Sequence, residues 1–173
     1  MKKITHKVHL ILGLVIGLVI IIVALTGCIY VFQEEIQNLT QSYRFVEKQS
    51  APLIPPTQLR DIAQKQLPGK TIHSVVYGEK ERAASVTFYN SDPDYYYIVY
   101  LNPTAGNVLK VKDMNADFFR FILDGHFYLW LPPSIGQPTV AIATLILVVM
   151  IITGIVLWWP KNTAAAKQRF SIK

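Results

Sequence analysis

The hydropathy pattern divides the chain of 173 residues into two long apolar runs and a mixed segment between them. The first run extends from Val8 to Phe32 without a charged residue, which as a helix would measure roughly 37 Å at about 1.5 Å per residue. The second run extends from Pro138 to Pro160, and Pro138 suits a first helical turn because proline lacks an N–H group. Each run can cross a hydrocarbon core of about 30 Å, so the pattern predicts two transmembrane helices.

In the segment between the runs, apolar residues alternate with polar ones at the spacings of short helices and strands, as in a small folded domain. A proline-rich break precedes residues 57–67, whose apolar positions share one helical face. We expect a short helix there, capped by Thr57 and ended by Pro68-Gly69. Strand-like runs separated by turn-forming residues then follow at 71–78, 83–90, 95–102 and 108–113. This order predicts a helix followed by an antiparallel sheet.

These patterns predict an α+β membrane protein made of six segments. They are a cytoplasmic tip (1–7), a transmembrane helix (8–32), an extracytoplasmic helix-plus-sheet domain (33–115), an interfacial aromatic segment (116–136), a second transmembrane helix (137–159) and a cytoplasmic basic tail (160–173). We expect the aromatic segment to form a helix at the membrane interface, because its Phe, Tyr and Trp residues are dense and directly precede the second span.

The formal net charge of +6 is concentrated at the two ends of the chain. Three of the 17 basic residues precede the first run and four follow the second, whereas the other ten lie between the runs with all 11 acidic residues. This distribution is typical of a two-pass protein of the bacterial inner membrane with both termini in the cytoplasm. A nucleic-acid-binding protein would cluster its basic residues on one folded face, so we expect no nucleic-acid partner.

The end of the first run admits two interpretations. Residues 25–28, Leu-Thr-Gly-Cys, resemble the lipobox after which bacterial lipoproteins are cut and lipidated. A cleaved signal has an apolar core of only about 7–15 residues, however, and this run continues to Phe32. Thr-Gly also recurs at 153–154, inside the second run. An uncleaved anchor is therefore favoured, with a lipoprotein as the alternative.

The middle segment contains no recognisable catalytic constellation, metal-ligand cluster or phosphate loop. The only cysteine, Cys28, allows neither an internal disulfide nor covalent haem attachment. Asp92 and Asp94 could be interpreted as paired carboxylates, but Asp and Pro together are more typical of a solvated turn. His73 fits a strand position as a surface or packed histidine rather than a ligand, and the run Tyr95–Tyr97 fits a strand whose aromatic side chains pack in a sheet.

Several motifs resemble the PepSY-associated transmembrane helix family of bacterial inner-membrane proteins, and the similarity covers nearly the whole chain. The first helix with its aromatic and acidic exit (9–36) is similar to that family's opening span. Residues 95–109, "YYYIVYLNPTAGNVL", resemble the end of a PepSY domain. Residues 121–137, "FILDGHFYLWLPPSIGQ", with Thr153-Gly154 and "LWWPK" (157–161), resemble its second span.

The resemblance implies a function in iron uptake. Family members include proteins linked to iron–siderophore uptake, and some are ferric-siderophore reductases whose membrane-helix histidines bind haem b. By motif match His9 and His126 are the haem-iron ligands expected here. Ionisable residues at membrane spans are functional suspects by default, and neutral imidazole is a good axial ligand. The alternative is that both are ordinary histidines at the membrane interface, and His6 is a weaker candidate.

The expected topology places His9 at the cytoplasmic end and His126 at the outer end, so they cannot bind one iron. Each would need a partner ligand from elsewhere, and two separate haems would result. The reductases of the family are usually longer, with four spans. This chain would therefore be a half-length member or a homodimer, and the spacing of Gly13 and Gly17 as G-x-x-x-G would permit close helix packing.

Two classes of function remain open from the sequence. One is a haem-binding electron-transfer component acting on siderophore iron, an oxidoreductase of the ferric-siderophore reductase type. With no flavin or nicotinamide motif, its electrons would come from quinol or another membrane donor. The other is a non-enzymatic, membrane-anchored PepSY module that binds or regulates a peptidase or a transporter, which would explain the lack of a catalytic constellation directly.

Overall fold

The computed structural model describes residues 2–47, 51–79 and 81–160, which divide into two compact units. The helical unit contains the chain up to Cys28 and from Leu123 onward, and the sheet unit contains Ile29–Ile122. The expected basic tail beyond Pro160 lies outside the described residues, as does Lys80 of one predicted turn. Two long apolar helices flank, along the sequence, a region with a helix and a four-stranded sheet, so the expected α+β class is confirmed.

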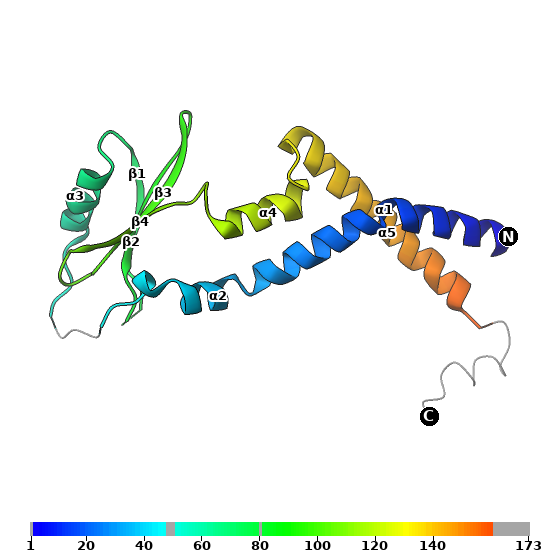
Figure 1. Ribbon diagram of the computed structural model, residues 1–173, viewed down its shortest axis with the longest axis horizontal. Helices are drawn as coiled ribbons and strands as arrows, with labels where there is room; N and C mark the ends of the chain where they lie inside the picture. The colour runs from blue at the N-terminus through cyan, green and yellow to red at the C-terminus, as the bar shows by residue number, and fades with distance from the viewer. Residues whose placement is uncertain (1, 48–50, 80, 161–173) are drawn as a thin grey trace, which may run out of the picture. The chain divides into compact units, whose positions relative to one another are not determined.

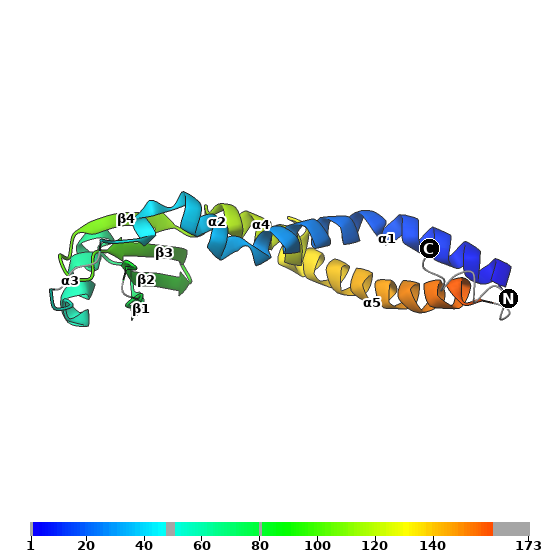
Figure 2. The same cartoon turned by 90° about the horizontal axis from the view of Figure 1, so that it is seen from below.

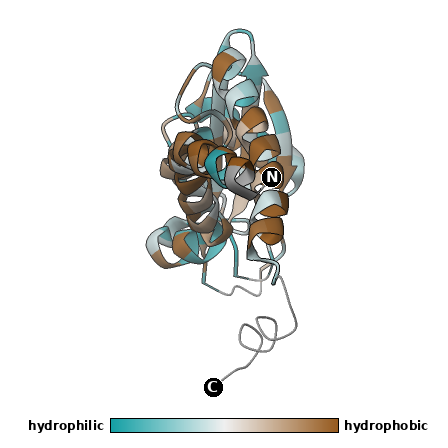
Figure 3. Ribbon diagram, turned by 90° about the vertical axis from the view of Figure 1, so that its right-hand side faces the viewer, coloured by the Kyte–Doolittle hydropathy of each residue, from teal (hydrophilic) through white to brown (hydrophobic). Residues whose placement is uncertain are grey.

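The helical unit is built on α1 (Lys2–Val31) and α5 (Pro133–Trp158), which lie side by side and antiparallel (Figures 1 and 2). Their outward side chains are apolar and exposed, with Leu14 75% and Leu145 68% accessible. Figure 3 shows the helical pair coloured predominantly hydrophobic. A helix that is apolar on all sides needs either a large core or a lipid environment. With no core around them, these helices are suited to a bilayer.

Small residues allow α1 and α5 to approach each other. A Cβ on Gly13 would lie 3.0 Å from Cε of Met150, whereas a Cβ on Gly17 would meet nothing within 4 Å. Ile16 and Ala143 are the buried apolar side chains of the two helices. Of the G-x-x-x-G pair, therefore, Gly13 alone serves the packing of the two spans within the chain.

The helix α4 (Phe118–Tyr128) follows the sheet and turns sharply into α5. Leu129 and Trp130 both adopt left-handed backbone conformations, with φ of 56° and 57°, which cost bulky residues energy and persist only where the surroundings impose them. A Cβ on Gly136 would lie 2.2 Å from the carbonyl oxygen of Tyr128. Only glycine therefore lets the first turn of α5 pack against the end of α4.

Two predicted helix starts are wrong. The helix α5 begins at Pro133 rather than Pro138, because Pro133 takes the first helical position and Pro138 is accommodated inside the helix. The helix α3 (Pro56–Gln66) likewise begins at a proline, and Thr57 lies in its first turn without a capping hydrogen bond. A proline suits the first position because its φ angle is already helical and it removes one of the free N–H groups of the first turn.

The first span does not continue as one helix beyond the membrane-spanning length. It ends at Val31, and after Phe32 a separate helix α2 (Gln33–Thr40) begins, followed by the 3₁₀ turn η1 (Ser42–Arg44). The amide of Ile36 still donates to the carbonyl of Phe32. The break between α1 and α2 coincides with the switch from apolar to polar sequence at Gln33.

The sheet unit contains a meander in which every neighbour is antiparallel and consecutive in sequence. Its strands are β1 (Ile72–Val76), β2 (Ala84–Ser91), β3 (Asp94–Leu101) and β4 (Val108–Asp113), in the order β1-β2-β3-β4. All four fall on the predicted runs or within one residue of them. Asp92 and Asp94 lie in the β2–β3 turn, where the Asp92 carbonyl accepts from the Asn90 side chain, so the turn interpretation is confirmed.

One face of the sheet forms the core with α3. Val86 pairs with Val99, Phe88 pairs with Tyr97, and Leu59 packs from the helix. The fully buried side chains are Leu59, Phe88, Val86, Val99 and Leu101. Because side chains alternate across a strand, the neighbouring positions point to the opposite face.

The opposite face carries aromatic residues from three adjacent strands. The His73 ring lies edge-on to Tyr89 at 6.0 Å between centroids, and Tyr89 lies edge-on to Tyr96 at 5.8 Å. Further along β3 on the same face, the ring of Tyr100 lies 5.1 Å from the ring of Tyr43 in η1, measured between centroids. The exposed His73 ring and Tyr96 therefore lie in one aromatic row on the sheet, as the sequence predicts for a surface histidine and a strand tyrosine.

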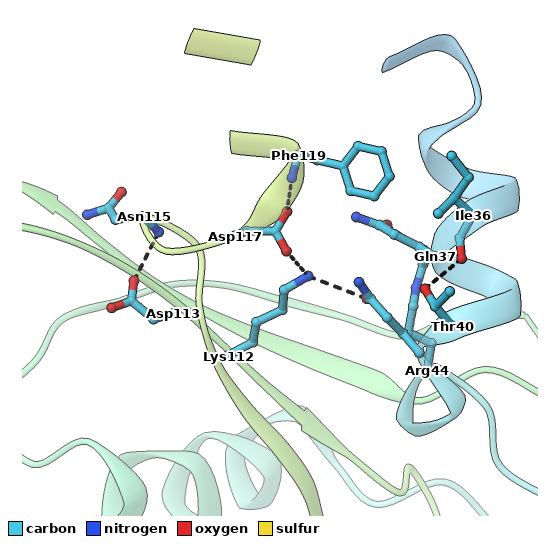
Figure 4. Close-up of polar contacts among 10 residues, drawn as sticks. Ile36, Gln37, Thr40, Arg44, Lys112, Asp113, Asn115, Asp117 and Phe119 are labelled. Carbon is cyan, nitrogen blue, oxygen red and sulfur yellow. Dashed lines mark hydrogen bonds and ion pairs between the residues drawn. The ribbon is translucent and has the colours of Figure 1, made fainter. Parts of the chain in front are cut away.

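A buried ion pair joins β4 to the start of α4 (Figure 4). The Lys112 ammonium lies 2.5 Å from Oδ2 of Asp117, and their side chains are only 10% and 6% exposed. The other carboxylate oxygen accepts from the backbone N–H of Phe119, the N-cap bond that satisfies a free donor of the first helical turn. Lys112 also donates to Gln41 at 3.4 Å. Asp117 thus serves as cap and counter-ion at once.

We predict that Leu59→Ala destabilises the sheet unit by about 2–5 kcal/mol, because it leaves a cavity in a fully buried position. Hydrogen exchange of the β2 and β3 amides in the full chain should accelerate about thirtyfold or more, since 1.4 kcal/mol corresponds to tenfold. The control is Leu53→Ala, whose side chain is 59% exposed. Equal exchange in the two variants would contradict the assigned core.

Asp117→Ala should destabilise the sheet unit by about 3–5 kcal/mol, because it leaves the Lys112 ammonium buried without a counter-ion. Asp113→Ala is the matched control, since Asp113 is exposed and only accepts from the Asn115 amide. Pulse proteolysis of the full chain across a urea series reports the cleavage midpoint within residues 29–122. The pairing assigned to Asp117 predicts a lower midpoint for Asp117→Ala alone.

Candidate functional site

The structure places His9 of α1 against the far end of α5. Its Nδ1 lies 2.9 Å from Oγ1 of Thr153, 144 residues away in the chain. The ring edge lies beside Gly154, where a Cβ would be 3.4 Å from Cε1 of His9, an ordinary contact distance. His9 is half-buried. The Thr-Gly pair of the second span therefore faces the histidine of the first.

The second histidine has a matching environment at the other end of α1. Nδ1 of His126, on α4, lies 2.9 Å from the carbonyl oxygen of Val23 and 3.4 Å from Oγ1 of Thr26. A Cβ on Gly27 would lie 2.9 Å from Cε1 of His126. This is closer than real Cβ contacts, so the ring occupies the space that the missing side chain leaves.

Both threonine hydroxyls also bond to their own helices. Oγ1 of Thr153 donates to the carbonyl of Val149 at 2.9 Å, and Oγ1 of Thr26 donates to that of Ile22 at 2.7 Å. A serine or threonine hydroxyl in an apolar helix commonly satisfies its proton in this way. Each hydroxyl oxygen then keeps a lone pair toward the histidine that faces it.

The two histidines are far apart, as expected. His126 contacts Val23 and Thr26, which lie 14 and 17 positions after His9 on one continuous helix. At about 1.5 Å per residue this corresponds to roughly 21–25 Å along α1. One metal ion or one haem iron cannot contact both rings, so the helical unit contains two separate histidine sites.

His6 and Cys28, which the sequence also singled out, do not belong to these histidine sites. His6 is exposed. Cys28 is also exposed, and it lies within α1, which continues without interruption to Val31. Throughout the part of the chain that the structure describes, no group of three or more His, Cys, Asp and Glu side chains could hold a metal ion. Each histidine site therefore offers one nitrogen ligand and no carboxylate or thiolate.

The role of the Thr-Gly pairs is what sequence reasoning missed. From the sequence, the Thr-Gly pairs at 26–27 and 153–154 served to favour an uncleaved anchor over a lipoprotein. The structure shows that each pair contacts a histidine of a different segment. The available signal was that the dipeptide occurs once in each span, and that each span or its approach also carries one histidine.

The sheet unit has a polar surface hollow of about 440 Å³ between α2, η1 and the strand ends. It is lined by Glu34, Arg44, Val76, Gly78, Glu79, Arg82, Ala83, Ser85 and Tyr100. Arg82 is occupied, since it donates to Asn38 at 2.8 Å and pairs with Glu34 at 3.3 Å. Burial raises the pKa of Tyr100 above its usual value, so its hydroxyl is neutral at physiological pH.

We predict that Gly27→Ala displaces the His126 ring, because the new methyl group would overlap Cε1. Gly17→Ala, in the same helix, is the matched control because nothing lies within 4 Å of its Cβ position. Imidazole NMR signals of the full chain in detergent micelles should shift for His126 in Gly27→Ala and stay unchanged in Gly17→Ala. An unmoved His126 signal in Gly27→Ala would contradict the assigned contact.

Comparison with known proteins gives one family match. The model of the family described as "PepSY-associated TM region" matches residues 6–173, nearly the whole chain and including both spans. No curated protein matches the chain. Since the match takes in α1, both histidine sites and the sheet unit, the two-pass membrane assignment follows from the family as well as from helix length. The chain belongs to the PepSY-associated transmembrane family.

Proposed function

We propose that this protein is a haem-binding electron-transfer component of iron–siderophore uptake or reduction in the bacterial inner membrane. His9 and His126 are the axial ligands in this proposal, each for a separate haem b. The observation that carries it is the pair of histidine sites, one near each end of α1, in which Nδ1 is hydrogen-bonded and Nε2 has no hydrogen bond to any described residue.

The chemistry of the two sites suits haem iron. A histidine ligand normally donates its second ring N–H to an oxygen, which fixes the tautomer and strengthens the ligating nitrogen. The Val23 carbonyl can only accept, so Nδ1 of His126 carries the proton and Nε2 keeps its lone pair. Among the described residues, nothing hydrogen-bonds to Nε2 of His9 or His126. Each ring can therefore provide one axial ligand.

When bound, haem supplies a one-electron ferric/ferrous couple whose potential depends on its axial ligands and their hydrogen bonds. The residues of this chain hold the ligand rings by hydrogen bonds to Nδ1. The separation of the two sites along α1 suits electron passage between the membrane faces. Electrons would come from quinol or another membrane donor, and iron held by a siderophore would be the acceptor.

Each site in the chain contributes one histidine, so a haem held there would need a further protein ligand. His6 precedes His9 by less than one helical turn and is exposed, so it would not be that ligand. We therefore propose that a second copy of the chain, or the second half of a longer homologous arrangement, provides the partner ligand. The basic ends of the chain favour an orientation with both termini in the cytoplasm and the sheet unit outside.

An anchored binding module is the second candidate function. The polar hollow and the aromatic face of the sheet unit favour it, because they offer contact surface without catalytic residues. In this case a peptidase or a transporter would be the partner, and the spans would serve as the anchor. A siderophore or its carrier could use the same surfaces under the first proposal.

The first proposal predicts a b-type spectrum for the full chain purified in mild detergent from haem-sufficient cells. Dithionite should produce a reduced α band, and His9→Ala and His126→Ala should each remove about half of it, since each histidine ligates its own haem. His6→Ala and His73→Ala are the matched controls and should keep the whole band, because both side chains are exposed and outside the two sites.

A colourless protein from haem-sufficient cells would overturn the haem proposal. So would a bound haem whose spectrum is unchanged in both His9→Ala and His126→Ala. A colourless protein that copurifies stoichiometrically with a peptidase or transporter subunit would instead support the anchored binding module.

A further inference from the structure

The two histidine sites differ in what holds the ring. His126 is held by a backbone acceptor, since the carbonyl oxygen of Val23 lies 2.9 Å from Nδ1, and Thr26 is more distant at 3.4 Å. No side-chain substitution removes a carbonyl. For the His9 ring the only hydrogen bond within the described chain is the one to Oγ1 of Thr153, at 2.9 Å. The orientation of His9 thus depends on a single side chain of the other span.

The direction of that hydrogen bond follows from the position of the hydroxyl proton. Oγ1 of Thr153 lies 2.9 Å from the carbonyl oxygen of Val149 and 3.1 Å from that of Met150. Two oxygen atoms at such distances need a proton between them, and a hydroxyl has only one. The Thr153 oxygen is therefore an acceptor toward His9, so Nδ1 of His9 carries the ring proton and Nε2 carries the lone pair.

We propose that Thr153 is a positioning residue for His9: its hydroxyl, offered from the second span, holds His9 as the Nδ1–H tautomer and keeps Nε2 free as the ligand atom. That Nε2 serves as a haem ligand rests on the proposed function, whereas the tautomer does not. Gly154 lies next to the same ring, and a Cβ at this position would be 3.4 Å from Cε1 of His9.

This assignment makes the two sites unequal in their dependence on helix packing. The acceptor for His126 is the Val23 carbonyl, which belongs to the backbone of α1. The acceptor for His9 is the Thr153 hydroxyl of α5, which meets His9 only while α5 stays in the same position along α1. Outer hydrogen-bond partners of a metal-ligating histidine typically change metal affinity by about 10–100-fold when they are removed. Loss of the Thr153 hydroxyl should therefore weaken haem binding at the His9 site and leave the His126 site unchanged.

The decisive measurement is the tautomer of each histidine in the full chain without haem. The chain is labelled with ¹⁵N-histidine, placed in detergent micelles, and assigned with His6→Ala, His9→Ala and His126→Ala. Long-range proton–nitrogen correlations should show wild-type His9 and His126 as Nδ1–H tautomers. Thr153→Val, which keeps the branched shape but loses the hydroxyl, should convert His9 at least in part to the Nε2–H form. Thr153→Ser should restore the Nδ1–H form.

Thr26→Val is the matched control, because the Val23 carbonyl remains, and neither histidine should change its tautomer. Haem titration of the same variants gives the second readout. In Thr153→Val the affinity of one of two sites should fall about 10–100-fold, and Thr153→Ser should recover it.

The results separate the two proposals. If wild-type His9 is the Nε2–H tautomer, or if Thr153→Val leaves it as Nδ1–H, the role assigned to Thr153 is wrong whether or not haem binds. If the tautomers behave as expected but no variant binds haem, Thr153 still positions His9 and the haem proposal fails by itself.

Discussion

A polar nitrogen placed among apolar helices must find a hydrogen-bond partner, because lipid offers none and an unpaired polar group in an apolar environment costs several kcal/mol. Within the described helical unit, His9 and His126 meet this constraint with hydrogen bonds to segments far away in the chain. Each resolves it at Nδ1, one with a threonine hydroxyl and one with a backbone carbonyl. Each contact thereby joins two segments of the helical unit that lie more than 100 residues apart in the chain.

The same constraint explains the placement of the glycines. A ring can reach an acceptor on a neighbouring helix only where that helix has no side chain in the way. Gly27 provides such a gap for His126, while Gly13 lets the end of Met150 approach α1. The His9–Thr153 contact and the close approach at Gly13 join α1 to α5, and the His126 contact joins α1 to α4. Since apolar side chains alone pack against lipid and against each other equally well, these specific contacts supply the register.

The sheet unit follows different physics, because it can bury apolar side chains away from water. The apolar core between the sheet and α3 stabilises it by the hydrophobic effect. The Lys112–Asp117 pair joins β4 to the N-terminus of α4. This pair is polar and buried, yet both partners have their hydrogen bonds satisfied, which is the condition under which a buried charge is tolerated. The sheet unit contributes surfaces, whereas the ligating chemistry proposed for this protein belongs to the helical unit.

The sequence by itself determined the two spans, the four strands and the two histidines of interest. Uninterrupted apolar length, alternation along strands and the rarity of ionisable residues near membrane spans are all local properties that a chain displays directly. It misplaced the start of α5, because Pro133 and Pro138 both satisfy the rule for a first helical position, and the structure places the start at Pro133 with Pro138 inside the helix. The partners of the histidines were decided only by the tertiary structure. Thr153 lies 144 residues from His9, and the acceptor of His126 is a carbonyl that every residue possesses. Such pairings depend on how one helix is rotated and shifted against another, and hydropathy along a single chain carries no information about that register.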